Sequence, residues 1–193
     1  MKTDIKLCGV GGQGILSIAT VIGEAATAAG INLKQAEVHG MSQRGGDVQS
    51  DLRLSTSEIF SDLIPHGCID LVISMEPMEA LRYLRYMSAK ATVITAATPL
   101  VNIPGYPAES ALQAEFDKLP NVVKIDIEAL AREAGNPKGA NMVLLGIAAK
   151  YIRILSPEAL REAIGRVFAR KGEAVVEANC RCFDRGMEEA KAL

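Results

Sequence analysis

A glycine-rich loop near the start of the chain is the first segment whose residues could do chemistry. The run Gly9-Val10-Gly11-Gly12-Gln13-Gly14 follows a short strand-like segment and precedes a stretch with helical spacing. In that context the glycines let the backbone turn tightly and approach a ligand, and free N–H groups at the helix start attract anions. The candidate residues for contact with a phosphate-bearing ligand are Gly9, Gly11, Gly12, Gln13 and Gly14.

Three interpretations of this loop remain open from the residues alone. Dinucleotide binding also requires an acidic residue about 20 positions on, at the end of the second strand, and Glu37 occupies that place. However, a polar glycine-bearing loop follows Glu37, where a plain Rossmann unit would continue into its next helix. The loop could therefore bind a nicotinamide or flavin, bind another phosphate-bearing ligand, or serve only as a tight turn.

The second unusual segment, residues 37–47, concentrates polar side chains and glycines to a degree that a simple connection does not need. An arginine fork and a histidine could hold a carboxylate or phosphate, and they could equally order the loop against a partner protein. We favour the second interpretation, in which the loop contacts a partner protein. The predicted interface residues are His39, Ser42, Gln43, Arg44, Gly45 and Gly46.

Apolar periodicity along the chain predicts alternating strands and helices. Expected strands cover residues 4–10, 31–39, 48–55, 69–75, 91–97 and 121–127, and expected helices cover 15–30, 76–87 and 109–118. From residue 126 onward the chain turns helical, with an almost wholly apolar helix at 141–155 that should be buried. These elements predict an α/β, Rossmann-like fold: one domain over residues 1–193, with a mostly parallel central sheet flanked by helices and a helical C-terminal third.

Several single residues have plain structural interpretations. His66 should lie in a turn, Ser156 should cap the helix that follows it, and Asn141 should cap another. Asp51 and Arg53 share one face of their strand and should pair at a surface or interface. The carboxylates of Glu76 and Glu79 suit the positive end of a helix that begins there.

Charge and cysteine usage exclude several classes of function. Lys and Arg total 21 against 23 Asp and Glu, with no basic run to follow nucleic acid, and no apolar run is long enough to be a membrane span or signal peptide core. We therefore expect no nucleic-acid or membrane partner and a cytoplasmic location. The four cysteines include no CxxC pair, which favours buried free thiols over a metal or cluster site.

Four segments together resemble one known family across nearly the whole chain. They are GVGGQGILSIATVIGEAA, AEVHGMSQRGGDVQSDLRL, LIPHGCIDLVISMEPMEALRYL and FARKGEAVVEANCRCFDRG. In this order they are similar to the gamma domain of the 2-oxoacid:ferredoxin oxidoreductases, which includes pyruvate enzymes. EVHGMSQRGG and EPMEALRYL are most similar to the beta subunit of the indolepyruvate:ferredoxin oxidoreductases.

That resemblance implies a non-catalytic subunit of an oxidoreductase complex that is inactive when isolated. Thiamine diphosphate, magnesium and [4Fe-4S] clusters would reside on a large partner subunit, coenzyme A would accept the acyl group, and ferredoxin would take electrons through the complex. The chain would bind no cofactor alone, although its glycine loop is a candidate for coenzyme A contact. Aryl pyruvates are the expected substrates, and a homodimer is an option for the isolated chain. Its lack of a GDG-type thiamine motif agrees with this division of roles.

Two alternative functions follow from the same fold. A free-standing nucleotide-binding reductase would use the glycine loop for a dinucleotide, and a non-enzymatic scaffold would use it only as a turn.

Overall fold

A computed structural model describes residues 1–40 and 45–193, which form one six-stranded sheet in the order β2-β3-β1-β4-β5-β6. β3 runs antiparallel to its neighbours β1 and β2, whereas β1, β4, β5 and β6 pair in parallel. The predicted mostly parallel α/β sheet is confirmed. The strands are β1 Lys2–Val10, β2 Asn32–His39, β3 Asp47–Ser55, β4 Ile69–Ser74, β5 Met87–Ala96 and β6 Val122–Ile125.

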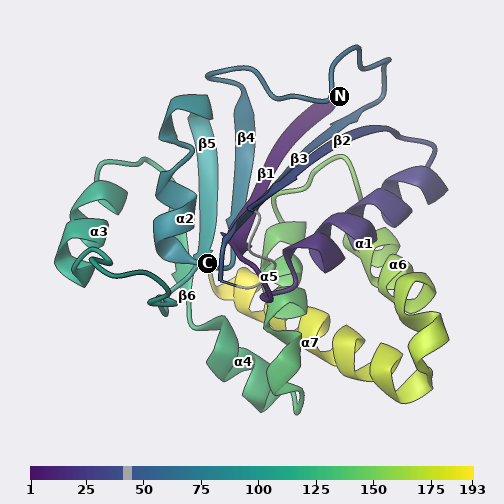
Figure 1. Cartoon of the computed structure of the whole chain (residues 1–193). Helices are drawn as coiled ribbons and strands as arrows, with labels where there is room; N and C mark the ends of the chain where they lie inside the picture. Colours follow the sequence, from purple (N-terminus) through teal and green to yellow (C-terminus); the bar gives the residue numbers. More distant parts are fainter. Residues whose placement is uncertain (41–44) are drawn as a thin grey trace.

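Helices cover the two faces of the sheet unequally (Figure 1). One face, called here the helical face, carries α1 Ile15–Ala28, α4 Ile127–Glu133, α5 Ala140–Ala149, α6 Pro157–Phe168 and α7 Glu173–Ala192. The other, called the second face, carries α2 Pro77–Leu81 and α3 Glu109–Phe116. Short 3-10 turns occur at Leu84–Tyr86, Pro137–Gly139 and Ala169–Lys171.

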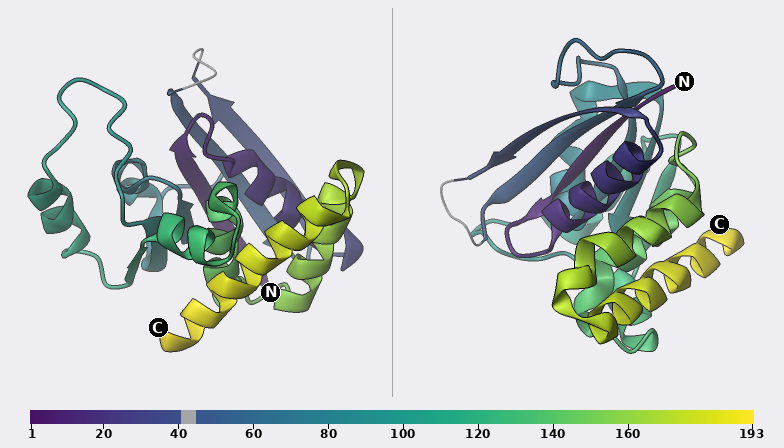
Figure 2. Two further views of the ribbon diagram at one scale, coloured as in Figure 1. Left: turned by 90° about the horizontal axis from the view of Figure 1, so that it is seen from below. Right: turned by 90° about the vertical axis from the view of Figure 1, so that its right-hand side faces the viewer.

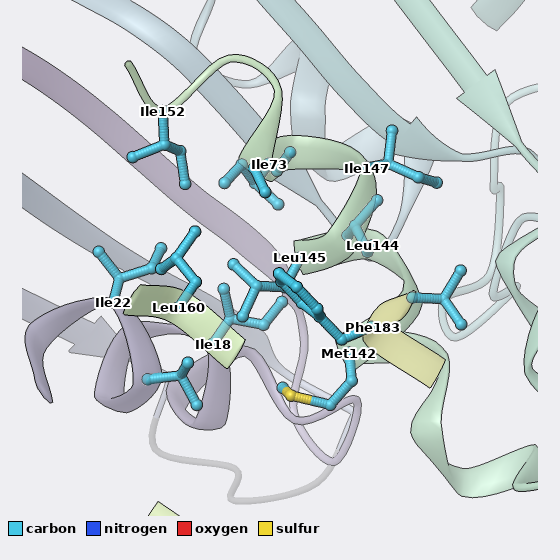
Figure 3. Packing of buried hydrophobic residues seen from close by; sticks show 14 of the residues in the cluster. Ile18, Ile22, Ile73, Met142, Leu144, Leu145, Ile147, Ile152, Leu160 and Phe183 are labelled. Carbon is cyan, nitrogen blue, oxygen red and sulfur yellow. The ribbon is translucent and has the colours of Figure 1, made fainter. Parts of the chain in front are cut away.

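The main core centres on α5, whose ten residues are all buried, as its continuous apolar sequence predicts. It packs against α7 and the sheet, with Leu144, Leu145 and Phe183 among the side chains that meet there (Figure 3). Gly146 on α5 and Gly186 on α7 let these two helices approach closely. A Cβ added to Gly146 would lie 2.1 Å from the Phe183 carbonyl oxygen, so only glycine fits.

Local signals place some element ends correctly and others incorrectly. The helix expected at 141–155 ends at Ala149, and the strand expected at 91–97 begins already at Met87. The Ser156 hydroxyl accepts the Ala159 N–H at 3.1 Å, which confirms the predicted cap of α6. The helix predicted for residues 76–87 was wrong in length, because α2 ends at Leu81 and β5 already begins at Met87. The chain leaves α2 through 3-10 bonds, Arg82 N–H to Glu79 and Tyr83 N–H to Ala80, and Tyr83 is buried against the sheet.

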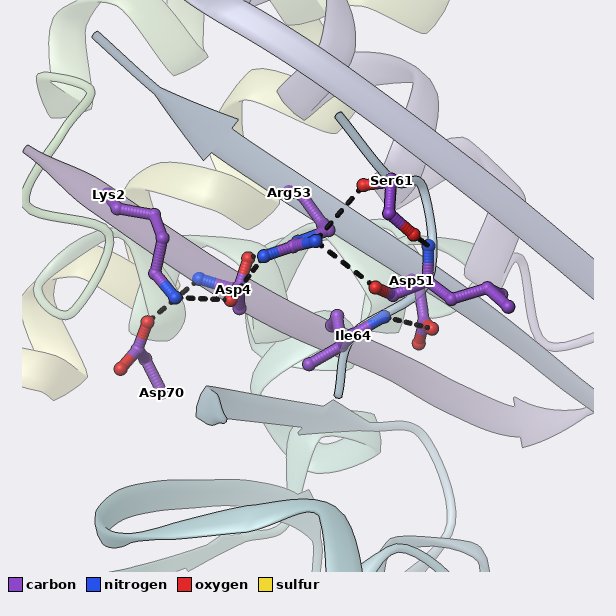
Figure 4. A network of polar contacts seen from close by, with 8 residues as sticks. Lys2, Asp4, Asp51, Arg53, Ser61, Ile64 and Asp70 are labelled. Atoms are coloured by element: carbon purple, nitrogen blue, oxygen red, sulfur yellow. Dashed lines mark hydrogen bonds and ion pairs between the residues drawn. The ribbon is translucent and has the colours of Figure 1, made fainter. Parts of the chain in front are cut away.

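A network of charged side chains on the second face holds the loop between β3 and β4 (Figure 4). The expected pair between Asp51 and Arg53 was wrong. Arg53 pairs instead with the fully buried Asp4, Nε to Oδ1 at 2.9 Å, and its guanidinium also donates to the carbonyls of Ser61 and Leu63. Asp51 pairs with Lys6 and accepts the Ile64 N–H. Residues two apart on one strand lie beside different neighbours, and here the adjacent strand β1 supplies both partners.

Candidate functional site

The glycine loop, residues 9–14, lies at the carboxyl end of β1, where ligands commonly bind in open α/β sheets. Gly14 has a φ of 81° and precedes α1. The Asn141 amide donates to the Gly14 carbonyl at 3.1 Å, and a Cβ at Gly14 would lie 2.5 Å from that amide nitrogen. The loop therefore needs glycine at Gly14 both for the left-handed backbone and for the approach of α5.

Asn141 was predicted to cap a helix, and that was wrong in detail. The N-cap of α5 is Gly139, and Asn141 lies inside the helix. Its side chain joins the Gly14 carbonyl to the Met142 N–H, thereby connecting α5 to the glycine loop.

Gln13 fixes the shape of the loop through its side-chain amide. Its Oε1 accepts the Val10 N–H at 2.7 Å and its Nε2 donates to the Met75 carbonyl at 3.0 Å. Since this amide already connects the ends of β1 and β4, ligand contact at the loop would rely on backbone N–H groups instead.

The carboxyl end of the second polar loop, at Gly45 and Gly46, contacts the glycine loop. The Gly11 N–H donates to the Gly46 carbonyl at 2.8 Å, and Gly45 donates to the Gly11 carbonyl at 3.4 Å. The Asn102 amide reaches the Gly45 carbonyl at 2.7 Å from the proline loop, defined here as residues 98–107. Three separate segments therefore meet, and we call this place the loop junction.

The Glu76 side chain holds the proline loop by hydrogen bonds. It is fully buried, and its Oε2 accepts the Glu79 N–H as the N-cap of α2, as expected for a carboxylate at that helix start. Its Oε1 accepts the Leu100 N–H at 3.3 Å and the Tyr106 hydroxyl. Burial, and then this bond to Glu76, raise the pKa of Tyr106, which keeps its hydroxyl protonated as a donor.

Glu79 is the second buried carboxylate of this corner, at 1% exposure. Its Oε2 pairs with Arg82 Nε at 2.7 Å. Burial raises the pKa of Glu79, and the nearby Arg82 partly offsets that effect.

The N-terminus of α1 is the part of the junction that can hold an anion. The N–H groups of the first turn of a helix have no partner within the helix, and the helix dipole favours negative charge there. Leu16 in this turn is 37% exposed, and apart from Gly12 and its two chain neighbours no atom of the described residues lies within 4 Å of a Cβ built on Gly12. The backbone at Gly12 therefore leaves space for a ligand to approach.

Not every predicted site residue falls within the described structure. Ser42, Gln43 and Arg44 lie outside the described residues, as does the side chain of His39. Gly45 and Gly46 are at the loop junction, beside Gly11. The interface that these six residues were predicted to form stays a prediction.

Glu37 does not have the place that dinucleotide binding requires. β3 separates its strand, β2, from β1 and the glycine loop, whereas a Rossmann unit sets its second strand directly beside the first. Glu37 is exposed at the edge of the sheet. This arrangement argues against a nicotinamide or flavin at the loop.

Sequence reasoning missed the three side chains that hold the junction together: Glu76 as anchor, Tyr106 and Asn102. Glu76 before Pro77 signals a helix start, but nothing near it points to Tyr106, 30 residues further along the chain.

The cysteines do not form a metal-binding group. Cys8 lies in β1 and is fully buried, Cys68 lies in the turn before β4, and Cys180 and Cys182 point to different sides of α7. Within residues 1–40 and 45–193 no cluster of three or more His, Cys, Asp or Glu could hold a metal ion. This donor set does not fit a [4Fe-4S] cluster.

A family model described as pyruvate ferredoxin/flavodoxin oxidoreductase matches residues 4–189. The indolepyruvate oxidoreductase subunit IorB of Thermococcus kodakarensis is 35% identical over 199 residues, covering 98% of this chain and 96% of that protein. The IorB subunit of Methanothermobacter thermautotrophicus is 39% identical over 156 residues, covering 77% and 79%.

Solved structures show the same fold. The gamma subunit of a keto/oxoacid ferredoxin oxidoreductase from Geobacter sulfurreducens superposes with a TM-score of 0.75 at 23% identity, covering 100% of this chain and 98% of that one. A 2-oxoglutarate:ferredoxin oxidoreductase chain from Magnetococcus marinus gives 0.77 at 22% identity, and this chain covers 31% of it. Among the described helices, none has the length and apolar character needed to cross a membrane.

Proposed function

The chain belongs to the pyruvate ferredoxin/flavodoxin oxidoreductase family, and on that premise we propose that it is the small, non-catalytic subunit of a 2-oxoacid:ferredoxin oxidoreductase. Indolepyruvate and other aryl pyruvates are the proposed substrates, because four IorB relatives are 33–39% identical to it. Its place of action is the cytoplasm.

The proposed division of labour puts the redox cofactors on a large partner subunit. Thiamine diphosphate with magnesium would attack the 2-oxoacid there, and [4Fe-4S] clusters would pass electrons to ferredoxin. The scattered, largely buried cysteines of this chain support that division, because they cannot hold a cluster together.

The observation that carries the role of this chain is the loop junction. The glycine loop presents the N-terminus of α1, and the proline loop beside it, which extends beyond the sheet in Figure 2, exposes Leu100, Val101 and Ile103 at 42%, 69% and 42%. Exposed apolar residues next to an anion-binding helix end suit a surface that meets a partner and covers the phosphates of coenzyme A.

The reductase alternative is weaker because Glu37 is separated from the glycine loop by β3. A scaffold would leave the α1 N-terminus without a ligand, and the kinetic experiment below separates that case from ours.

Co-expression with the large subunit tests assembly. We expect a stable complex that oxidises indolepyruvate with coenzyme A and reduces ferredoxin or a viologen, whereas the isolated chain has no activity. Failure of the two chains to form a complex would contradict the proposal.

A pair of matched variants tests the glycine loop within that complex. Leu16→Glu adds a negative charge beside the proposed phosphate site, whereas Leu16→Gln has nearly the same shape without the charge. Both variants remove the same partly buried leucine, and glutamate in the first turn gains about 0.3–1 kcal/mol from the helix dipole, so a kinetic defect confined to Leu16→Glu comes from its charge. We expect the KM for coenzyme A to rise several-fold for Leu16→Glu only. Equal KM values for the two variants would place coenzyme A elsewhere.

A further inference from the structure

A cavity separate from the loop junction opens on the second face of the sheet. It has a volume of about 550 Å³, which lies within the range of roughly 300–1,000 Å³ typical of ligand pockets. Side chains of β1, β2 and β3 form its floor, and residues 61–66 and 82–86 form its walls. No residue of the glycine loop lines it.

One wall of this cavity is aromatic. The rings of His66 and Tyr86 lie with centroids 4.2 Å apart and planes tilted by 39°, and Tyr83 is next to them. Val38 and Leu63, which are 54% and 60% exposed, also line the cavity. A planar apolar group can stack against such rings and bury its own surface at the same time.

The floor of the cavity holds a buried charged pair that is already satisfied. Lys6 is 5% exposed, contacts Asp51, and donates to Gln49 Oε1 at 2.9 Å. The Lys6 ammonium also lies 4.6 Å from the centroid of the Tyr83 ring. The second oxygen of Asp51 accepts the Ile64 N–H. The Oδ1 of Asp51 therefore faces the Lys6 ammonium in an ion pair, and its Oδ2 and the Gln49 amide oxygen each accept a hydrogen bond.

The hydrogen-bond donors that line the cavity, by contrast, include several without a partner among the described residues. Arg82 uses Nε for Glu79, which leaves the N–H groups of its two terminal nitrogens. Among the side chains that the structure describes, which exclude that of His39, none forms a hydrogen bond with those nitrogens or with the hydroxyls of Tyr83 and Tyr86. A ligand that matches this lining supplies acceptors rather than donors.

We propose that this cavity is a binding site for a small aromatic carboxylate, with the ring stacked on Tyr86 and His66 and the carboxylate held by Arg82. The aromatic wall selects the planar group, and the surplus of donors selects the anionic acceptor. The argument uses only the lining of the cavity, although aryl pyruvates, the proposed substrates of the complex, belong to the same chemical class.

Binding of indole-3-acetate to the purified chain tests the site, measured by calorimetry and by changes in the amide NMR spectrum. We expect saturable binding with a Kd on the order of 1 mM or tighter, as for a ligand of this size. Indole, which lacks the carboxylate, should bind about 5- to 10-fold more weakly, and tryptamine, with an ammonium group, should not saturate. Equal binding of tryptamine and indole-3-acetate, or no saturation by indole-3-acetate, would overturn the proposal.

Variants locate the site. His66→Ala and Tyr86→Leu should each weaken the binding of indole-3-acetate at least about 5-fold. Arg82→Lys keeps the charge opposite Glu79 but loses the guanidinium fork, so it should reduce the difference in affinity between indole-3-acetate and indole. Tyr151→Leu is the matched control, because Tyr151 lines a different cavity at the amino ends of β1, β4 and β5. His66 is exposed in a turn, so its variant decides the question if Tyr86→Leu proves unstable. Unchanged affinity for His66→Ala would refute the location.

Discussion

Substituting either glycine at the α5–α7 contact should destabilise the protein, although alanine normally favours a helix. A Cβ on Gly146 would lie 2.1 Å from the Phe183 carbonyl oxygen, and a Cβ on Gly186 would lie 2.1 Å from the Val143 carbonyl oxygen. Ordinary contact begins near 3.4 Å, so the helices must separate by roughly 1 Å in a tightly packed interior. Overpacking of this kind costs about 1–3 kcal/mol or more, which exceeds the gain of about 1 kcal/mol in helix propensity.

We therefore expect Gly146→Ala to lower the free energy of unfolding by about 2 kcal/mol, and the Tm by about 4–8 °C for a chain of this size. Gly165→Ala in α6 is the control, because outside its chain neighbours and the backbone of its own helix no atom of the described residues lies within 4 Å of the added Cβ. It should raise stability by up to about 1 kcal/mol. The double variant of Gly146 and Gly186 should cost less than the two single changes combined, since one separation of the helices accommodates both methyl groups. A Tm for Gly146→Ala equal to that of Gly165→Ala would refute this reasoning.

Two further outcomes concern thiol reactivity and pH. Burial raises the pKa of Cys8 to about 12 and also raises the pKa of Cys180 and Cys182. A thiol reagent at pH 8 should therefore modify the half-buried Cys68 first and the other three cysteines only on unfolding. Rapid modification of two or more thiols in the native protein would contradict this. Burial raises the folded-state pKa of Glu79 above its ordinary 4.5, so the folded state binds the Glu79 proton more tightly than the unfolded state does. This residue therefore lowers stability as the pH rises from about 4.5 through the folded-state pKa. The Tm measured across that pH window should fall less steeply for Glu79→Gln than for the wild type, and parallel curves would show that Glu79 is not the cause.

Local patterns in the sequence were sufficient for much of the fold. The alternation of strands and helices, the cap at Ser156 and the burial of α5 all follow from side-chain types within a few residues of one another. The glycine loop was also recognisable, because its meaning depends only on the strand before it and the helix after it. The length of α2 could not be recognised from the sequence, since burial of Tyr83 against the sheet ends that helix early.

The sequence by itself therefore determined the order of most strands and helices, though not all of their ends, and it identified the family through the order of four motifs. Only the tertiary structure decided what surrounds the loops. Insertion of β3 between β2 and β1 moves Glu37 away from the glycine loop, and Asn141 reaches Gly14 across 127 residues of chain. The pairing of β3 with β1 also gives Asp51 and Arg53 their partners on β1. Such contacts depend on which strands become neighbours and in what register, and no local propensity specifies that choice.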